Sequence, residues 1–230
     1  MRVRSCLLAF VLFFAILPVP ARAASLFPPY KYEGEMRYAA SGLAAGTRVR
    51  LYEAEHEKHY TVSTPSGGRV RVPWDAVMPI AVPSPALREP SAAEIADFVG
   101  ERMHSRTGVL LWVDLARVRV YLLEYGDEGW TLVRTLRCSV GDAAHPTPSG
   151  RFEIAYRSAS IGKENLYLCR HALCFYGGYM LHSVLYDWAG ESVTDGRLGE
   201  RISHGCIRLS PKDSEYLYRT VPIGTAVYVR

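Results

Sequence analysis

Short runs of alternating apolar and polar residues, closed by Gly or Pro turns, recur along this sequence and predict a mainly β fold. In residues 68–73 valines alternate with arginines, so one face of that strand is expected to be buried and the other wet. Ser66-Gly67-Gly68 separates this run from residues 59–63 as a hairpin turn. Further strands are expected at residues 46–52, 109–114, 118–125, 130–138, 152–155, 167–170, 175–182 and 226–229.

Two helices interrupt the strands. Ser91 and Glu94 form a capping box that opens a helix within residues 92–107, and its apolar side is expected to pack on the part of the chain that follows. Ser210 followed by Pro211 caps a second helix that runs to about residue 219. The fold class predicted is therefore mainly β, a twisted sandwich or barrel-like domain with one or two short helices, preceded by a small β-barrel module.

Four prolines within residues 79–91 divide the chain of 230 residues into two parts. Residues 25–78 are expected to form the small β module, residues 79–91 a stiff linker, residues 92–107 a connecting helix and residues 108–230 a larger domain. With Trp74 to Val77 closing its barrel, the first unit resembles the Src-homology-3-type modules of bacterial wall enzymes. Wall binding through its tyrosines and a purely structural role both remain open.

Residues 1–23 have the three parts of an export signal. Arg2 and Arg4 form its positive start, residues 6–19 its apolar run, and Ala21-Arg22-Ala23 a small-x-small cleavage site. The run is shorter than the ~20 residues that span a bilayer, so no stable membrane span is expected after cleavage; an uncleaved anchor is the alternative. The net charge of +4 includes arginines of this segment, so charge indicates no nucleic-acid partner. The sequence specifies no oligomeric state.

The residue pattern that points to chemistry is Ser203-His204-Gly205-Cys206-Ile207-Arg208, with His182-Ser183 about twenty residues upstream. A thiol attacks a carbonyl as its thiolate, so a nucleophilic Cys206 needs an imidazole, for which His182 and His204 are the candidates. A glycine before the cysteine permits the tight turn on which an oxyanion hole is commonly built. A small buried thiol beside a histidine is the structural alternative.

The order of these residues resembles the L,D-transpeptidase catalytic domain, the YkuD family, across residues 108–230. The landmarks that carry the resemblance are Gly141-Asp142, the run from His145 to Phe152, His182-Ser183, Leu198-Gly199 and the run from Ser203 to Leu209. The resemblance implies that Cys206 is the nucleophile, that His182 is the general base, and that the Ser183 carbonyl fixes the imidazole tautomer. It also implies backbone N–H groups of His204, Gly205 and Cys206 as oxyanion donors.

Arg208 and Ser203 are expected at the substrate. The forked guanidinium of Arg208 suits a carboxylate, although a structural clamp on loop carbonyls suits it equally well. The loop between His182 and Ser203, which includes residues 186–191 and 195–197, is a little longer than in many family members. A longer loop beside the site would shape the choice of acceptor.

The resemblance implies an exported enzyme of the periplasm or cell wall whose partners are peptidoglycan stem peptides, with no cofactor. Its cysteine would form a thioester with a stem tetrapeptide, release D-Ala and pass the acyl group to an amine of another stem, giving a 3-3 cross-link. Water as acceptor would make it a carboxypeptidase or hydrolase, and a lipoprotein lysine would make it an attachment enzyme. A non-catalytic wall-binding protein is the alternative from a different class.

The other cysteines of the exported chain are Cys138, Cys169 and Cys174. Cys169 and Cys174, expected on two extended runs joined by residues 170–173, are the likeliest disulfide; two buried free thiols fit equally well. With His171 they also suggest a metal, but their spacing matches no common zinc pattern, so none is expected.

Overall fold

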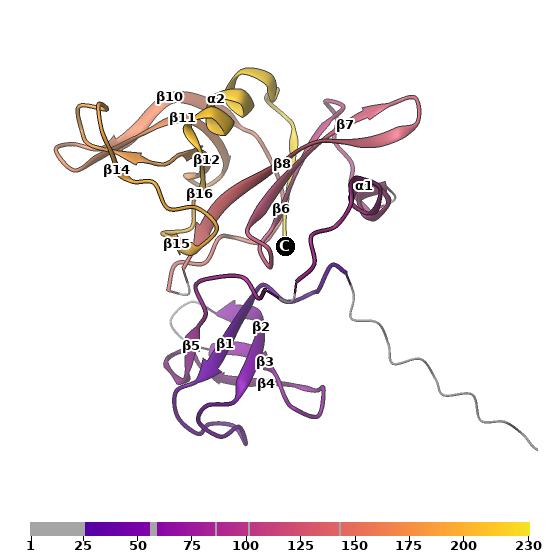
Figure 1. The fold of residues 1–230 in the computed structure, drawn as a ribbon, viewed down its shortest axis with the longest axis vertical. Coiled ribbons are helices and arrows are strands. Elements are labelled where there is room, and N and C mark those ends of the chain that lie inside the picture. Colours follow the sequence, from indigo (N-terminus) through magenta and orange to yellow (C-terminus); the bar gives the residue numbers. More distant parts are fainter. Residues whose placement is uncertain (1–25, 56–58, 86, 101, 143) are drawn as a thin grey trace, which may run out of the picture.

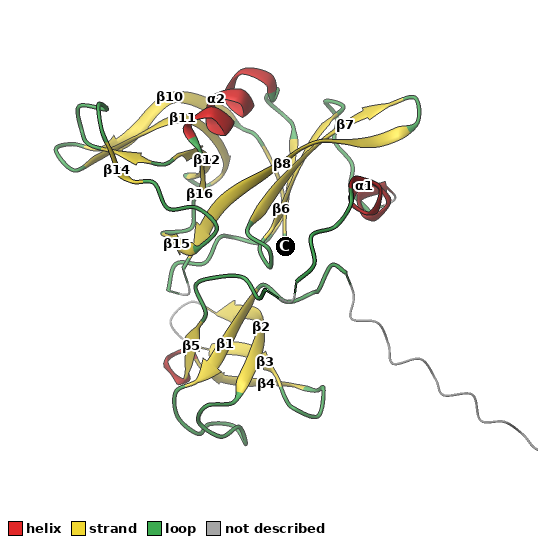
Figure 2. Cartoon of the chain, in the orientation of Figure 1, coloured by secondary structure: helices red, strands yellow, loops and turns green. Residues whose placement is uncertain are grey.

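The computed structural model describes residues 26–55, 59–85, 87–100, 102–142 and 144–230. It consists of two strand-built parts joined by a linker, with the smaller part below the larger one in Figure 1. Strands dominate both parts and helices are few, as Figure 2 shows, so the predicted mainly β class is confirmed. The predicted export signal, residues 1–23, lies outside the described residues.

The smaller part is an antiparallel sheet with the strand order β4-β3-β2-β1-β5. Alternate residues of its strands, such as Val49, Leu51, Val62 and Val72, point into one apolar core, as the valine and arginine alternation predicts. The turn at residues 64–68 joins β3 to β4 as expected. Its elements are β1 (Tyr32–Met36), β2 (Arg48–Glu55), β3 (His59–Ser63), β4 (Arg69–Pro73), the 3-10 turn η1 (Trp74–Ala76) and β5 (Val77–Pro79).

Helix α1 (Ala92–Gly100) follows the linker. The capping box is present, because the Ser91 N–H donates to a Glu94 carboxylate oxygen at 2.9 Å and the Glu94 N–H donates to Ser91 Oγ at 3.3 Å. The expected helix over residues 92–107 is too long. The helix ends at Gly100, a poor helix former, although Met103 still packs in the same apolar cluster as the helix.

The larger part is one strongly curved sheet with the strand order β14-β13-β11-β12-β16-β8-β7-β6-β17-β9, in which β10 also pairs with β11 and β15 with β8. Helix α2 (Pro211–Thr220) begins at the predicted Ser210 cap. The strands are β6 (Val109–Asp114), β7 (Arg119–Gly126), β8 (Gly129–Gly141), β9 (Gly150–Glu153), β10 (Tyr156–Lys163), β11 (Tyr167–Tyr176), β12 (Tyr179–Ser183), β13 (Leu185–Tyr186), β14 (Val193–Asp195), β15 (Arg201–Ser203), β16 (Ile207–Leu209) and β17 (Ala226–Val229).

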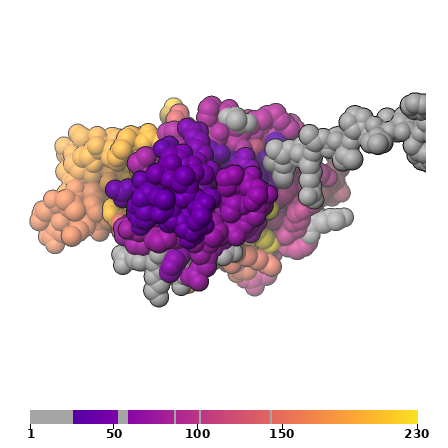
Figure 3. All heavy atoms as spheres, turned by 90° about the horizontal axis from the view of Figure 1, so that it is seen from below, coloured from indigo at the N-terminus to yellow at the C-terminus, as the bar shows by residue number. Residues whose placement is uncertain are grey.

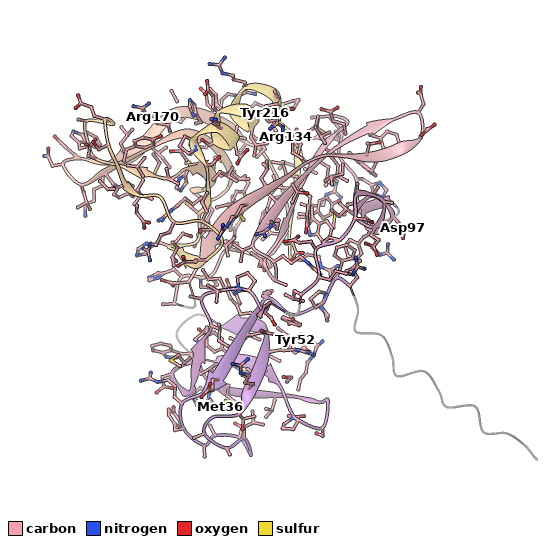
Figure 4. The ribbon with its side chains drawn as sticks, viewed as in Figure 1. Met36, Tyr52, Asp97, Arg134, Arg170 and Tyr216 are labelled. Atoms are coloured by element: carbon pink, nitrogen blue, oxygen red, sulfur yellow. The ribbon has the colours of Figure 1, made fainter. Side chains whose placement is uncertain are left out.

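Both faces of the sheet around β6 and β7 are apolar, because each face belongs to a core cluster that also contains residues of one helix. Leu111 and Val113 belong to the main core with Leu217 of α2, whereas Leu110 and Trp112 contact the cluster that contains α1. Figure 4 labels Arg134 and Tyr216 where β8 meets α2, and there the guanidinium carbon lies 3.8 Å from the ring centre. The predicted packing of the first helix on the larger part is therefore confirmed.

The strand expected at residues 175–182 is wrong, because a hairpin turn at Gly177 and Gly178 splits it into β11 and β12. Both glycines have positive φ, +47° and +96°, as a two-residue hairpin loop of this hand requires. This turn reverses the chain so that β12 can pair with β16 in parallel, which brings residue 182 beside residue 208. Strand β10 was also not anticipated from the sequence.

The proposed disulfide between Cys169 and Cys174 is wrong. Both residues lie on the single strand β11, and five steps along a strand separate them by roughly 15 Å, far beyond disulfide reach. The structure has both thiols free and buried, together with Cys138. Among the described residues, no helix is long and apolar enough to cross a membrane.

Candidate functional site

The parallel pairing of β12 with β16 builds the site. Leu181 pairs with Ile207 and His182 with Arg208, so the register puts Cys206 beside Met180, one position before the first pair. Side chains alternate along both strands. Leu181 and Ile207 therefore enter the main core, whereas Met180 and Cys206 share a small cluster on the opposite face. That opposite face carries His182 and Arg208 as well.

His182 is buried, and its Nδ1 lies 2.6 Å from the Ser183 carbonyl oxygen. A carbonyl only accepts, so Nδ1 carries the proton and Nε2 is the basic nitrogen. The pKa of His182 is lowered to about 4. Burial is the main cause and the Arg208 charge adds to it, while the hydrogen bond to the Ser183 carbonyl acts in the opposite direction. The imidazole is therefore neutral near pH 7 and able to accept a proton.

Cys206 is half-buried at the start of β16. Burial raises the pKa of this thiol, while the Met180 backbone N–H and the Arg208 charge act in the opposite direction and Cys174 reinforces the rise. The resting pair is thus a neutral thiol and a neutral imidazole. Such a pair can react when the imidazole takes the thiol proton as the sulfur attacks.

The turn before Cys206 is fixed by Ser203 and Gly205. Ser203 Oγ donates to the Cys206 carbonyl at 2.5 Å and accepts from the Gly205 N–H at 3.1 Å. Gly205 has φ +104°, and a Cβ at this position would collide with the ring of Tyr179. Only glycine fits there. Because its N–H is already bonded to Ser203, Gly205 is not the free oxyanion donor that the resemblance implied.

Arg208 is 5% exposed and contacts a carboxylate of the chain itself. Its Nη1 donates to Asp195 Oδ2 at 2.8 Å, and Arg197 binds the same carboxylate through Nε and Nη2. Hydrogen bonds from Arg197 and Arg208 hold the pKa of Asp195 far below its usual range. A structural clamp on loop carbonyls was the alternative for Arg208; among the described residues its side chain pairs with the Asp195 carboxylate instead. The Arg208 Nε is buried without a hydrogen-bond partner among the described residues.

His204 lies apart from this cluster. It is exposed, and its ring packs against the ring of His145 with 4.6 Å between the centres. His145 in turn contacts Asp142, whose Oδ1 accepts from the His145 backbone N–H at 2.7 Å. Of the two candidate bases, only His182 is buried, oriented and in the strand next to the nucleophile. No group of three or more His, Cys, Asp and Glu within the described ranges is arranged to hold a metal.

The model of the YkuD family, the L,D-transpeptidase catalytic domain, matches residues 108–229, which includes every strand and turn of the site. The chain belongs to this family. A member of the YkuD family is expected to carry out transpeptidase chemistry, which agrees with a thiol and imidazole set on neighbouring strands.

A curated relative and a solved structure are also similar to this YkuD-family chain. The Escherichia coli (strain K12) protein named probable L,D-transpeptidase ErfK/SrfK is 36% identical over 90 residues, which cover 36% of this chain and 26% of the relative. A fused Zn-dependent amidase/peptidase/peptidoglycan-binding domain-containing protein from Clostridium acetobutylicum ATCC 824 is 27% identical with a TM-score of 0.52. That match covers 66% of this chain and 65% of the other. The chain therefore spans about a quarter of the curated relative's length.

Two residues of the site were not identified from sequence. Tyr179 covers Gly205, and its only sequence signal is the Gly177-Gly178 pair that starts its strand. Asp195 neutralises Arg208 from the lengthened loop, and a carboxylate next to Arg197 in that loop was its signal. Neither signal predicts which residue is contacted, because Gly205 and Arg208 are distant in sequence from Tyr179 and Asp195.

Proposed function

We propose that this protein is an exported cysteine L,D-transpeptidase that acts on peptidoglycan stem peptides. Cys206 would attack the carbonyl of the third residue of a stem tetrapeptide, a diamino acid, and expel the terminal D-Ala. An amine of another stem would then take the acyl group from sulfur to give a 3-3 cross-link. The observation that carries this proposal is the buried, neutral His182 with Nδ1 held by Ser183, in the strand beside the Cys206 thiol.

In the proposed chemistry the His182 imidazole accepts and returns every proton that is transferred. Nε2 of His182 takes the thiol proton as the sulfur of Cys206 bonds to the carbonyl carbon, and the imidazolium then gives that proton to the departing D-Ala amine. In the second half, His182 takes a proton from the attacking amine and returns it to the sulfur when the thioester breaks. Only the acceptor differs if water replaces the amine.

The oxyanion of each tetrahedral intermediate needs backbone donors near the sulfur. Because the Gly205 N–H already donates to Ser203 Oγ, we propose the N–H groups of Cys206 and His204 as the oxyanion donors. Gly205 would serve by its conformation, since its positive φ permits the tight turn between His204 and Cys206.

Arg208 is proposed to lie near a carboxylate of the substrate, which its forked guanidinium suits. Its charge is already balanced by Asp195, so the pair would position a substrate carboxylate by hydrogen bonding more than by net charge. Ser203 would act by holding the turn.

We also propose the division of the chain. Residues 1–23 would direct export, residues 25–78 would form the Src-homology-3-type module, residues 79–91 the linker, and residues 108–230 the catalytic domain. The export signal supports a periplasmic or wall location, where the proposed substrate resides.

The test is mass spectrometry of the products that form when residues 25–230 are incubated with disaccharide-tetrapeptide. Cross-linked dimer that forms with the wild type and not with Cys206→Ala would support the transpeptidase. Tripeptide alone would replace this proposal by the carboxypeptidase. Unchanged substrate with both folded proteins would reject stem peptides as sole donor and acceptor, leaving a lipoprotein acceptor or the wall-binding alternative.

A further inference from the structure

Arg201 is a buried arginine that ties three separate segments together. It is 4% exposed, and no carboxylate of the described residues pairs with it. Its backbone N–H donates to the Ala81 carbonyl at 2.8 Å and Nη1 donates to the Ile80 carbonyl at 3.1 Å, both in the linker. Its Nη2 donates at 3.1 Å to the carbonyls of Leu115 and Ala116 in the turn between β6 and β7. Arg201 thus fixes the linker against the catalytic domain.

The smaller part reaches the same arginine through β1. The Lys31 carbonyl accepts from Arg201 Nη2 at 3.4 Å, and the ring centre of Tyr32 lies 5.1 Å from the guanidinium carbon. The Tyr32 hydroxyl, 109 positions away in sequence, donates to the Gly141 carbonyl at 3.3 Å. Figure 3 shows the smaller part lying across the underside of the larger one. The two parts therefore meet through specific polar contacts.

Gly141 connects this contact to the loop of residues 144–149. The Gly141 N–H donates to Thr147 Oγ1 at 2.8 Å. A Cβ at residue 141 would collide with the backbone of His145 to Thr147, so this loop lies directly on the strand. The loop reaches the turn of the nucleophile, where a Cβ at Gly205 would lie 3.5 Å from the Pro146 carbonyl oxygen.

Strand β15 provides the second connection. Arg201 begins this strand and Ser203 ends it, and Ser203 pairs with Gly141 of β8. The Asp142 N–H donates to the Ser203 carbonyl at 2.8 Å. Because Ser203 Oγ holds both ends of the turn that carries Cys206, a displacement of β15 would move the nucleophile. Figure 1 shows β15 at the edge of the larger part that faces the smaller one.

We propose that the smaller part is a structural component of the catalytic centre, and that Arg201 and Tyr32 are positioning residues that hold β15 and the loop of residues 141–142 and 144–149 around Cys206. A module that only tethers the enzyme to the wall would not need a buried cation and a buried hydroxyl aimed at the two segments that flank the nucleophile. The expected effect on kcat rests on the proposed transpeptidase function. The expected effect on hydrogen exchange does not.

Two conservative changes in the full chain test the inference, each with a matched control. Tyr32→Phe removes only the hydroxyl bonded to Gly141. Its control is Tyr121→Phe, because the buried Tyr121 hydroxyl has no partner among the described residues. Arg201→Lys keeps the positive charge but removes the planar guanidinium that donates to several carbonyls at once. Its control is Arg117→Lys, a buried arginine that also joins the N-terminal segment to the larger part but lies outside the strand that leads to Cys206.

Hydrogen exchange measured by mass spectrometry is the readout that does not depend on the reaction. Both test variants should raise exchange about three- to tenfold in two segments, residues 201–207 and the loop of residues 141–142 and 144–149, because these segments lose a local restraint. The controls should not raise it. In the transfer reaction both test variants should lower kcat by about three- to tenfold. The KM for the donor should stay within about twofold of the wild-type value.

Exchange in these two segments that stays at the wild-type level in both test variants would overturn the inference. Equal effects in test variants and controls would also overturn it, because they would indicate general destabilisation. If the wild type forms no transfer product, the proposed function fails, and the exchange data still decide whether the smaller part holds the site.

Discussion

Stability between pH 7.5 and pH 5 should depend strongly on His182. An unfolded histidine has a pKa of about 6.5, whereas burial lowers the pKa of His182 to about 4. Between these values the unfolded chain binds a proton that the folded chain rejects, so the free energy of unfolding rises with pH across this window. The stability is complete above about pH 6.5 and is lost as the pH falls toward 4.

The size of the effect follows from the two pKa values. The full difference corresponds to about 3 kcal/mol below pH 4, and about 2 kcal/mol of it is already lost at pH 5. His182→Asn should remove this loss. The Asn side-chain nitrogen can take the place of Nδ1 and donate to the Ser183 carbonyl, and it does not titrate.

Urea unfolding at pH 7.5, 6 and 5 measures the effect as a difference between variants. The wild type should lose about 2 kcal/mol more than His182→Asn on going from pH 7.5 to 5. His204→Asn, which removes an exposed imidazole from the neighbouring turn, is the matched control and should follow the wild type. If the pH dependence of His182→Asn runs parallel to that of the wild type, the imidazole is not held neutral by burial and the proposed general base is wrong.

Three further outcomes are expected. Gly205→Ala should lower the free energy of unfolding in urea by about 2 kcal/mol or more, because residue 205 has positive φ and faces the Tyr179 ring; adding Tyr179→Ala should restore part of the loss, and no restoration would contradict the contact. Ser203→Ala should cost about 1–3 kcal/mol by the same assay and reduce kcat, since two backbone groups of the turn lose their partner; unchanged kcat would refute the role. Asp195→Asn leaves the Arg208 charge unbalanced, so the pH midpoint for alkylation of the nucleophile should fall; a midpoint that stays or rises would refute the coupling.

Local signals predicted much of the fold. Alternation in residues 68–73 predicted a strand because the side-chain period of a strand is two residues. The Ser91 and Ser210 caps marked both helix starts because capping involves residues three apart. The end of α1 and the hairpin at Gly177 were misjudged although both have a local signal, Gly100 for the helix end and the Gly177-Gly178 pair for the turn.

The chemical residues of the candidate site can be identified without the fold. The run from Ser203 to Arg208 and the pair His182-Ser183 identify a thiol, a base and a turn, because their types and order carry that information. The folded chain adds that His182 lies in the strand paired with β16 and that Asp195 balances Arg208. It also brings Tyr32 to Gly141. The Arg208 and Tyr32 contacts join residues 13 and 109 positions apart, and a linear pattern of residue types specifies neither sheet register nor solvent exclusion.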